Sequence, residues 1–483
     1  MKKKFYITTP VYYVNDKPHI GHAYTSVAAD VLARFHKLQG DEVFFLMGTD
    51  EHGLKIQQKA GESGKDPQEY ADEIAGEFKS LWDKLDIKYD SFIRTTDEKH
   101  KAAVQKVLQT LFDKGAIYRG LYRGLYCVGC EQFKNENDLV DGKCPDHDTV
   151  CEKVEEESYL LKTNDLQQDL IGKIESYEFQ IRPEKYKKEI LSFLKSQPLN
   201  DVSISRKNVK WGIPLPFDAE HTTYVWFDAF LSYLTGLGWN GDILRLSLRK
   251  TKGLALEKLK FWPADVQLIG KEILRVHGTI WPAMLMHLGI EFPKLLFVHG
   301  HIQSGGRKMS KTIGNTISID EMLEKFGVDG TRYLLMSAGT FGEDVDVTME
   351  RLTEKYNADL ANGIGNLISR VVKLSSISNF KFQISNQFQM TEFRKMVEAM
   401  ELNGALDKIW EIIRINDKFI EENKPWELVK TDKAKFEKIM QKLISDLYLI
   451  SELIIPFMPD TSEKIKKALE TKKTEGLFPR IKS

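Results

Sequence analysis

The sequence lacks long hydrophobic runs, internal repeats, low-complexity segments and a surplus of charge of either sign. No apolar run approaches the roughly 20 residues that a membrane-spanning helix needs. The basic start Met1–Lys4 precedes too few apolar residues for the core of a signal peptide. The 69 basic and 70 acidic residues leave a net charge of -1, so composition alone indicates no nucleic-acid partner. We therefore expect a cytoplasmic protein that does not bind membranes.

Cysteine is also scarce, and all four cysteines, Cys127, Cys130, Cys144 and Cys151, fall in one short segment. In a chain without an export signal, such a cluster favours a metal site over disulfides. The pairs Cys127–Cys130 and Cys144–His147 each have the spacing of a zinc knuckle, and four N and S ligands satisfy tetrahedral zinc. A closed set of four leaves no position for water, so we predict one structural Zn²⁺ ion per chain. Cys151 is the alternative to His147 as fourth ligand.

Patterns typical of strands and of helices alternate along two parts of the chain. The strand-like runs are 5–14, 43–47, a short run near Phe92, 222–227, 266–269 and 295–298, and the main helix-like runs are 22–39, 67–85, a run ending at Lys114 and 273–288. Alternation of this kind predicts a parallel sheet with crossover helices. The pattern stops near 117 in a segment rich in glycine and cysteine, resumes near 224, and gives way to helical periods alone after 350. The sequence therefore predicts one nucleotide-binding sheet, split by an insertion and followed by helices.

The first candidate phosphate-binding segment is His19-Ile20-Gly21-His22, where a strand gives way to a helix. A helix N-terminus offers N–H groups and the positive end of the helix dipole to phosphate. Two imidazoles can donate hydrogen bonds to phosphate oxygens, and Gly21 lets a flat base approach the backbone. Taken alone, the segment could equally be two surface histidines at a helix start.

The second segment is the loop Gly305-Gly306-Arg307-Lys308-Met309-Ser310-Lys311-Thr312. Its glycines permit movement, and its lysines can meet the charge that develops as pyrophosphate departs. In isolation the loop would be an exposed basic turn. In this order, and about 290 residues apart, the two segments resemble the paired signature motifs of class I aminoacyl-tRNA synthetases. The loop departs from the commonest form only at Thr312, where serine is usual, and the hydroxyl group is retained.

This resemblance implies an ATP site and its chemistry. The implied ATP-binding residues are His19, Gly21, His22, Lys308, Met309, Ser310 and Lys311. The implied catalytic residues are His19 and His22, which hold the phosphates, and Lys308 and Lys311, which stabilise the transition state of adenylate formation. Mg²⁺ is expected to accompany ATP and neutralise its phosphates.

Four stretches resemble methionyl-tRNA synthetases: Pro10–Tyr13, Gly48–Gly53, Tyr224–Ala229 and Gly270–Ala283. The resemblance implies that Asp50 pairs with the substrate ammonium. The implied pocket for the side chain consists of Val11, Tyr13, Trp226, Ala229, Phe230, Tyr233, His277 and Trp281. A thioether favours aromatic contacts, and Tyr13 and His277 could donate hydrogen bonds to sulfur, which accepts weakly. Without the resemblance, the two tryptophans would be read as ordinary core residues.

In the helical region, Asn366 and Arg370 are four residues apart and share one helix face, and Trp426 offers a stacking platform for a base. These three resemble the anticodon-reading positions of methionyl-tRNA synthetases. The alternative is a buried tryptophan beside a polar surface. The implied partners are initiator and elongator tRNA(Met), ATP and L-methionine. Some family members carry a further C-terminal domain linked to dimerisation; this chain ends at Ser483 directly after the helices, so we expect a monomer.

The resulting prediction is an α/β fold: a Rossmann-like parallel-sheet catalytic domain, split by a zinc-binding connective insertion and followed by an all-α C-terminal helix-bundle domain. The expected bounds are 1–116 and 224–300 for the two catalytic halves, 117–223 for the insertion, 301–350 for the lysine-loop junction and 351–483 for the anticodon-binding helices. The implied activity is that of a methionine–tRNA ligase. The alternatives are a class I synthetase for isoleucine, valine, leucine or cysteine, a small-molecule nucleotidylyltransferase, and an RNA-binding protein without catalysis.

Overall fold

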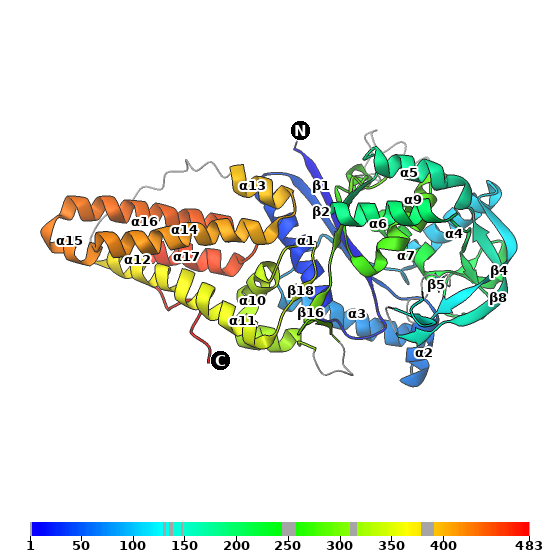
Figure 1. The fold of residues 1–483 in the computed structure, drawn as a ribbon, viewed down its shortest axis with the longest axis horizontal. Coiled ribbons are helices and arrows are strands. Elements are labelled where there is room, and N and C mark those ends of the chain that lie inside the picture. Colours follow the sequence, from blue (N-terminus) through cyan, green and yellow to red (C-terminus); the bar gives the residue numbers. More distant parts are fainter. Residues whose placement is uncertain are drawn as a thin grey trace. The chain divides into compact units, whose positions relative to one another are not determined.

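The computed structural model describes residues 2–128, 132–134, 139–145, 148–243, 257–309, 316–377 and 391–482. The chain forms two compact units, which are described separately. Unit 1 comprises Met1–Pro18, Asp41–Asp83 and Lys88–Val298, and unit 2 comprises His19–Gly40, Lys84–Ile87 and His299–Ser483. Figure 1 labels their helices and strands.

Unit 1 is built on a six-stranded sheet with the strand order β3-β2-β1-β14-β15-β9. Its strands are β1 (Lys4–Tyr13), β2 (Glu42–Asp50), β3 (Ser91–Arg94), β9 (Gln180–Arg182), β14 (Val266–Gly270) and β15 (Leu295–His299). The pairings of β1 with β2 and β14, of β2 with β3, and of β15 with β9 are parallel. Pro10 lies at the register shift between Thr8 and Val11, where a residue without an N–H is tolerated. The predicted parallel α/β sheet is confirmed.

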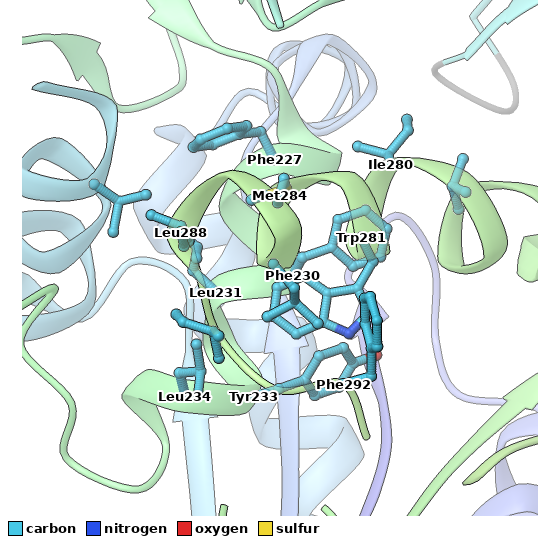
Figure 2. Packing of buried hydrophobic residues seen from close by; sticks show 14 of the residues in the cluster. Phe227, Phe230, Leu231, Tyr233, Leu234, Ile280, Trp281, Met284, Leu288 and Phe292 are labelled. Atoms are coloured by element: carbon cyan, nitrogen blue, oxygen red, sulfur yellow. The ribbon is translucent and has the colours of Figure 1, made fainter. Parts of the chain in front are cut away.

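The helices of unit 1 are α2 (Leu54–Glu62), α3 (Pro67–Lys84), α4 (Glu98–Asp113), α5 (Gln167–Glu175), α6 (Glu184–Ser196), α7 (Val225–Thr235) and α9 (Leu274–Leu288). Helices α3, α4 and α9 follow the predicted runs closely. Helices α7 and α9 pack against each other, and Figure 2 shows Phe230, Tyr233 and Trp281 among the buried side chains of this core. Apolar burial of this kind stabilises the fold by about 25 cal/mol per Å².

The strand predicted at 222–227 is wrong. Strand β13 (Asp218–Thr223) covers only the first two residues of this run and belongs to a separate three-stranded sheet with β11 (Ser205–Arg206) and β12 (Pro214–Leu215). Val225, Trp226 and Phe227 instead form the first turn of α7. Their β-branched and aromatic side chains favour strands locally, but Val225 and Phe227 are buried and Trp226 is partly buried here as part of a helix, so tertiary packing overrides the local preference.

The segment near 117–150, rich in glycine and cysteine and without a predicted strand or helix, contains one long strand. Strand β4 (Ile117–Cys127) pairs antiparallel with β8 (Glu152–Leu161) over ten residue pairs. The short strands β5 (Gln132–Lys134), β10 (Val202–Ser203), β6 (Lys143–Cys144) and β7 (Thr149–Val150) complete this part. Strand β4 was not predicted because it contains Gly120 and Gly124, and glycines usually indicate turns. Both glycines alternate with tyrosines on one face of the strand. Strand β9, also within the expected insertion, pairs instead with β15 in the main sheet.

Unit 2 is mostly helical. Its helices are α1 (Ile20–Leu38), α10 (Ile319–Ser337), α11 (Met349–Lys355), a π-helix (Tyr356–Gly365), α12 (Asn366–Ser376), α13 (Thr391–Glu398), α14 (Leu402–Asn423), α15 (Pro425–Thr431), α16 (Lys433–Ile454) and α17 (Pro459–Thr471). Helices α12, α14, α16 and α17 lie side by side as a bundle (Figure 1). The predicted C-terminal helical domain is confirmed.

A small sheet of β16 (Ile302–Ser304), β17 (Arg307–Lys308) and β18 (Val345–Asp346) precedes the bundle within unit 2. Fully buried Arg332 on α10 forms an ion pair of 2.7 Å with Asp30 on α1. The same guanidinium donates hydrogen bonds to the carbonyl oxygens of Leu85, Pro456 and Phe457. One side chain therefore ties together four segments of unit 2. Among the described residues, no helix is both long enough and apolar enough to cross a bilayer.

Candidate active site

Five aromatic residues predicted to contact methionine lie together in unit 1. Trp226, Phe230 and Tyr233 lie on α7, and His277 and Trp281 lie on α9. The ring centroid of Phe230 is 4.9 Å from that of His277 and 5.6 Å from that of Trp281. Trp226 completes the group, with its ring centroid 5.7 Å from that of Phe230. The two helices thus bring together residues from two distant stretches of the sequence as one aromatic group.

The other predicted methionine contacts lie on α7 and at the ends of two neighbouring strands. Tyr13, the last residue of β1, is paired in register with Asp50, the last residue of β2. Val11 and Tyr13 pack against the core cluster that contains the α7 and α9 side chains, and Ala229 is buried on α7. Ligands of parallel sheets bind at the carboxyl ends of the strands, so Asp50 is placed where a ligand is expected.

His277 is held as a neutral ring. Its Nδ1 lies 3.0 Å from the carbonyl oxygen of Ile273, which can only accept, so Nδ1 carries a hydrogen. Burial lowers the pKa of His277 to about 4, so at neutral pH Nε2 is a lone-pair acceptor. It accepts from the hydroxyl of Tyr233 at 2.9 Å. In this arrangement His277 has no N–H left to donate to a thioether, and its contribution is to orient Tyr233.

The two tryptophans differ in their surroundings. Trp281 is fully buried, and its Nε1 donates a 3.0 Å hydrogen bond to Oε1 of Gln267. Its large side chain is therefore part of the core as well as of the aromatic group (Figure 2). Trp226 is only partly buried, and its Nε1 is enclosed without a hydrogen-bond partner among the described residues. Nε1 of Trp226 is therefore a buried donor whose acceptor the described residues do not supply.

In unit 2, His19 and His22 form the start of α1. His19 is the N-cap residue: its Nδ1 accepts from the amide of Gly21 at 3.1 Å, and Nδ1 of His22 accepts from the amide of His19 at 3.2 Å. The two rings stack with centroids 3.8 Å apart. Burial, and the neighbouring His19, hold the pKa of His22 well below its ordinary value. Since Nδ1 accepts in both rings, the neutral form of each carries its hydrogen on Nε2, which makes that nitrogen the donor of the ring.

Gly21 favours this arrangement, because a Cβ at this position would lie 3.0 Å from the His19 ring and the ring would have to shift slightly. The helix start was predicted two residues too late, at 22 instead of Ile20. Histidine is not one of the usual N-cap residues, so this cap could not be recognised from residue type.

The lysine loop begins in the small sheet of unit 2. Gly305 and Gly306 have φ of 64° and 71°, a left-handed turn that favours glycine, between the antiparallel strands β16 and β17. The amide of Gly306 donates to Oδ1 of Asp346 at 2.9 Å. Lys308 belongs to β17 and Met309 is partly buried. The side chain of Lys308, and Ser310 and Lys311 entirely, lie outside the described residues.

Three of the four cysteines, Cys127, Cys144 and Cys151, lie in one small buried cluster against Leu125 and Leu139. The other two predicted zinc ligands, Cys130 and His147, lie outside the described residues. Within the described part of the chain, no three potential ligands are arranged around a common metal position.

The predicted anticodon residues are on the surface of unit 2. Asn366 is exposed at the first turn of α12, and Arg370 forms ion pairs with Glu421 at 2.6 Å and Asp417 at 3.5 Å. Trp426, on α15, is 44% exposed. The alternative of a buried tryptophan at this position is therefore wrong.

Comparison with known proteins now decides the family. The model for class I tRNA synthetases of the methionine type matches residues 5–152 and 147–372, and the model for the anticodon-binding domain of methionyl tRNA ligase matches residues 379–480. The chain belongs to the methionyl-tRNA synthetase family. It is 41% identical to the methionine–tRNA ligase of Caldanaerobacter subterraneus subsp. tengcongensis, over 100% of this chain and 79% of that protein. It is 40% identical to the Thermotoga maritima enzyme, over 96% of this chain and 74% of that protein.

Solved structures of the methionyl-tRNA synthetase family have the same fold. The Mycobacterium tuberculosis enzyme in complex with methionyl-adenylate superposes with a TM-score of 0.88 and 32% identity, covering 99% of this chain and 97% of that one. Its apo form gives a TM-score of 0.82 with 29% identity, covering 100% and 99%. The predicted activity, ATP-dependent ligation of methionine to tRNA(Met), is confirmed, and the alternative functions are excluded.

The sequence analysis of this methionyl-tRNA synthetase family member missed several buried polar residues beside the predicted site. Asp228 on α7 contacts His52, and Glu51 accepts two hydrogen bonds from Arg94, at 2.7 and 2.8 Å. The available signal was Asp228, a carboxylate within the otherwise apolar start of a buried helix, since charged residues are seldom fully buried unless paired.

Proposed function

We propose that the aromatic group on α7 and α9, together with Val11, Tyr13, Asp50 and Ala229, forms the methionine site. The observation that carries this proposal is the neutral His277, which holds the Tyr233 hydroxyl among aromatic rings. The flat, polarisable rings suit a thioether, and Asp50 supplies a charge-assisted bond to the ammonium. The carboxylate of methionine then attacks the α-phosphorus of ATP, which gives methionyl-adenylate and pyrophosphate, and methionine passes to the tRNA.

The second part of the proposal concerns ATP. His19 and His22 donate Nε2–H groups to phosphate oxygens beside the N-terminus of α1, where the helix dipole favours an anion. Gly21 gives the nucleotide access to the backbone, and Lys308, Met309, Ser310 and Lys311 contact the triphosphate. Lys308 and Lys311 stabilise the charge on the departing pyrophosphate, and bound Mg²⁺ would neutralise the phosphates. Catalysis is then mainly positioning and charge stabilisation.

We further propose a structural zinc held by Cys127, Cys130, Cys144 and His147. The buried cluster of three cysteines supports this proposal, because soft thiolates packed in a small apolar lobe suit zinc. Cys151 belongs to the same cluster and stays the alternative to His147. Metal analysis of protein purified without chelators should give about one zinc per chain, whereas less than about half would contradict the site. Loss of zinc from His147→Ala but not from Cys151→Ala would assign the fourth ligand.

Asn366, Arg370 and Trp426 are proposed to read the anticodon of initiator and elongator tRNA(Met). Exposure of Trp426 supports the proposal, because a stacking platform must be open to a base. The domain bounds given from the sequence, a monomeric state and a cytoplasmic location remain part of this proposal. Light scattering tests the monomer, for which a mass near 55.6 kDa is expected.

The experiment that tests the methionine site is ATP–pyrophosphate exchange with Asp50→Asn. Loss of the charged partner should raise the KM for methionine by at least about tenfold, since a hydrogen bond to a charged group contributes about 1.5–3 kcal/mol. The KM for ATP should stay within about twofold. Equal changes in both constants, or no change in either, would contradict the assigned role of Asp50.

A further inference from the structure

A buried chain of polar groups lies on α7, on the opposite side of the helix from the aromatic group. Oδ2 of Asp228 lies 2.8 Å from Nδ1 of His52, and Oδ1 lies 3.2 Å from Nε2 of His100. Nδ1 of His100 continues the chain to Oγ1 of Thr235 at 2.7 Å. Asp228 and His100 are fully buried and His52 is 4% exposed, so water cannot replace these bonds. None of these four residues has a part in the reaction described above.

The chemistry of these hydrogen-bonded side chains determines which atom donates in each bond. Burial alone would raise the pKa of Asp228, but the imidazoles of His52 and His100 lower it below the ordinary value. An ionised carboxylate only accepts, so both imidazoles donate to it. Neutral rings suffice, with the hydrogen on Nδ1 of His52 and on Nε2 of His100. Loss of the carboxylate would leave two buried N–H donors without acceptors, which is costly.

His52 connects this chain to the proposed ammonium site, since it follows Asp50 by two residues in the turn after β2. Other bonds hold the same turn to other parts of unit 1. The carboxylate of Glu51 binds Arg94 on β3. The backbone carbonyl oxygen of Glu51 accepts a 2.5 Å hydrogen bond from Nε1 of Trp211. Neither of these bonds involves α7. The contact between His52 and Asp228 is a buried side-chain bond that ties the turn to the helix carrying the aromatic group.

We propose that Asp228 is a positioning residue for methionine: through His52 it fixes the spacing between Asp50 and the aromatic group on α7. The two ends of methionine, ammonium and thioether, must be bound at once, so this spacing determines how well one small molecule satisfies both. A misplacement of about 1 Å can cost about a hundredfold in rate. Asp228 does not touch the substrate in this account. The inference rests on the proposed role of Asp50.

The test compares three conservative variants in ATP–pyrophosphate exchange. Asp228→Asn and His52→Gln should each raise the KM for methionine by about tenfold and leave the KM for ATP within about twofold. The matched control is His100→Asn, whose shorter amide can replace Nδ1 toward Thr235 but not Nε2 toward Asp228. It loses a bond to the same carboxylate but is not part of the Asp50 turn. It should lower the melting temperature about as much as His52→Gln does, with a KM for methionine within about threefold of the parent. If His52→Gln and His100→Asn change this KM equally, the role is merely structural and the proposal is overturned.

A double-mutant cycle separates this inference from the proposal about Asp50. Once Asp50 is replaced by Asn, adding Asp228→Asn should change the KM for methionine by less than about twofold, because Asp228 acts through Asp50. If the two substitutions instead multiply the KM for methionine independently, the inference is overturned and the role of Asp50 is unaffected. If Asp50→Asn alone leaves this KM unchanged, the proposed ammonium site itself is wrong. Should Asp228→Asn fail to fold, the same cycle with His52→Gln gives the decision.

Discussion

The residues proposed to bind methionine and those proposed to read the anticodon are presented in opposite ways by the fold. Tyr233, His277 and Trp281 are almost completely buried, and their polar atoms bind one another, the backbone or the side chain of Gln267. Asn366 and Trp426 are exposed on the helical bundle, and Trp426 presents 44% of its surface to solvent. The first group is preorganised by packing, whereas the second lies open on the surface to a partner as large as tRNA.

This difference predicts how substitutions behave. A change in the aromatic group alters packing, hydrogen bonding and substrate affinity together, because the same atoms serve all three. A change on the exposed bundle surface alters RNA binding with little effect on folding, since surface substitutions usually change stability only slightly. The predictions below test that separation, beginning with a buried residue of unit 2 that carries no proposed binding role.

Arg332→Met should have the largest effect. It leaves buried Asp30 with Arg34 as its partner and removes the donors to three buried carbonyl oxygens. Breaking a buried pair in this way costs about 3 kcal/mol or more, so thermal unfolding of unit 2 should occur at a clearly lower temperature. The control is Lys464→Ala, which breaks an exposed pair with Asp460 and should leave the melting curve unchanged. Similar melting curves for both variants would contradict this view of Arg332.

Trp426→Ala should reduce aminoacylation of tRNA by about a hundredfold, the upper end of what loss of one stacked base costs. Methionine-dependent ATP–pyrophosphate exchange and the melting temperature should be nearly unchanged, because the side chain is exposed. The matched control is Trp410→Phe on α14, whose indole is buried and donates to Asp359. That variant should lower the melting temperature instead. Joint loss of exchange and aminoacylation in Trp426→Ala would point to a structural role and remove the contrast between the two regions.

His277→Ala should raise the KM for methionine by about tenfold and leave the KM for ATP within about twofold. The Tyr233 hydroxyl loses its acceptor and its orientation, and an unsatisfied buried donor costs about 1–3 kcal/mol. Steady-state exchange kinetics give both constants. His287→Ala is the control, because this partly exposed histidine at the end of α9 binds the carbonyl oxygen of Lys162. It should leave the KM for methionine unchanged, and a matching rise there would show that the effect is not specific to the aromatic group.

The same contrast explains how much could be predicted from the sequence. Strands β1 and β2 and helix α9 lie within a few residues of their expected positions, because local periodicity and burial agree there. The run at 222–227 and strand β4 were misread, because buried aromatic residues suggested a strand and alternating glycines suggested turns. The bonds of Asp228 to His52 and His100 join residues 176 and 128 positions apart, and no local pattern reports such contacts. The hydrogen positions on His277 likewise follow only from its neighbours in space.

The smallest effect is expected for Asp417 on α14, at the border between the buried bundle interior and the exposed Asn366–Arg370 face. Burial is the main cause that raises the pKa of Asp417 to about 6, although Arg370 acts in the opposite direction. In the unfolded chain this carboxyl titrates near 3.9, so between about pH 4 and 6 the folded state binds more protons. Ionisation of Asp417 therefore costs stability as the pH rises through this window, and Asp417→Asn should relieve that cost.

Relative to the parent, the melting temperature of the variant should rise by about 1–2 °C between pH 4.5 and pH 7.5, as differential scanning fluorimetry can measure. The side chain is 28% exposed, which screens its charge and keeps the effect small. A difference in melting temperature that does not change with pH would show that Asp417 is already ionised at pH 4.5, held so by Arg370.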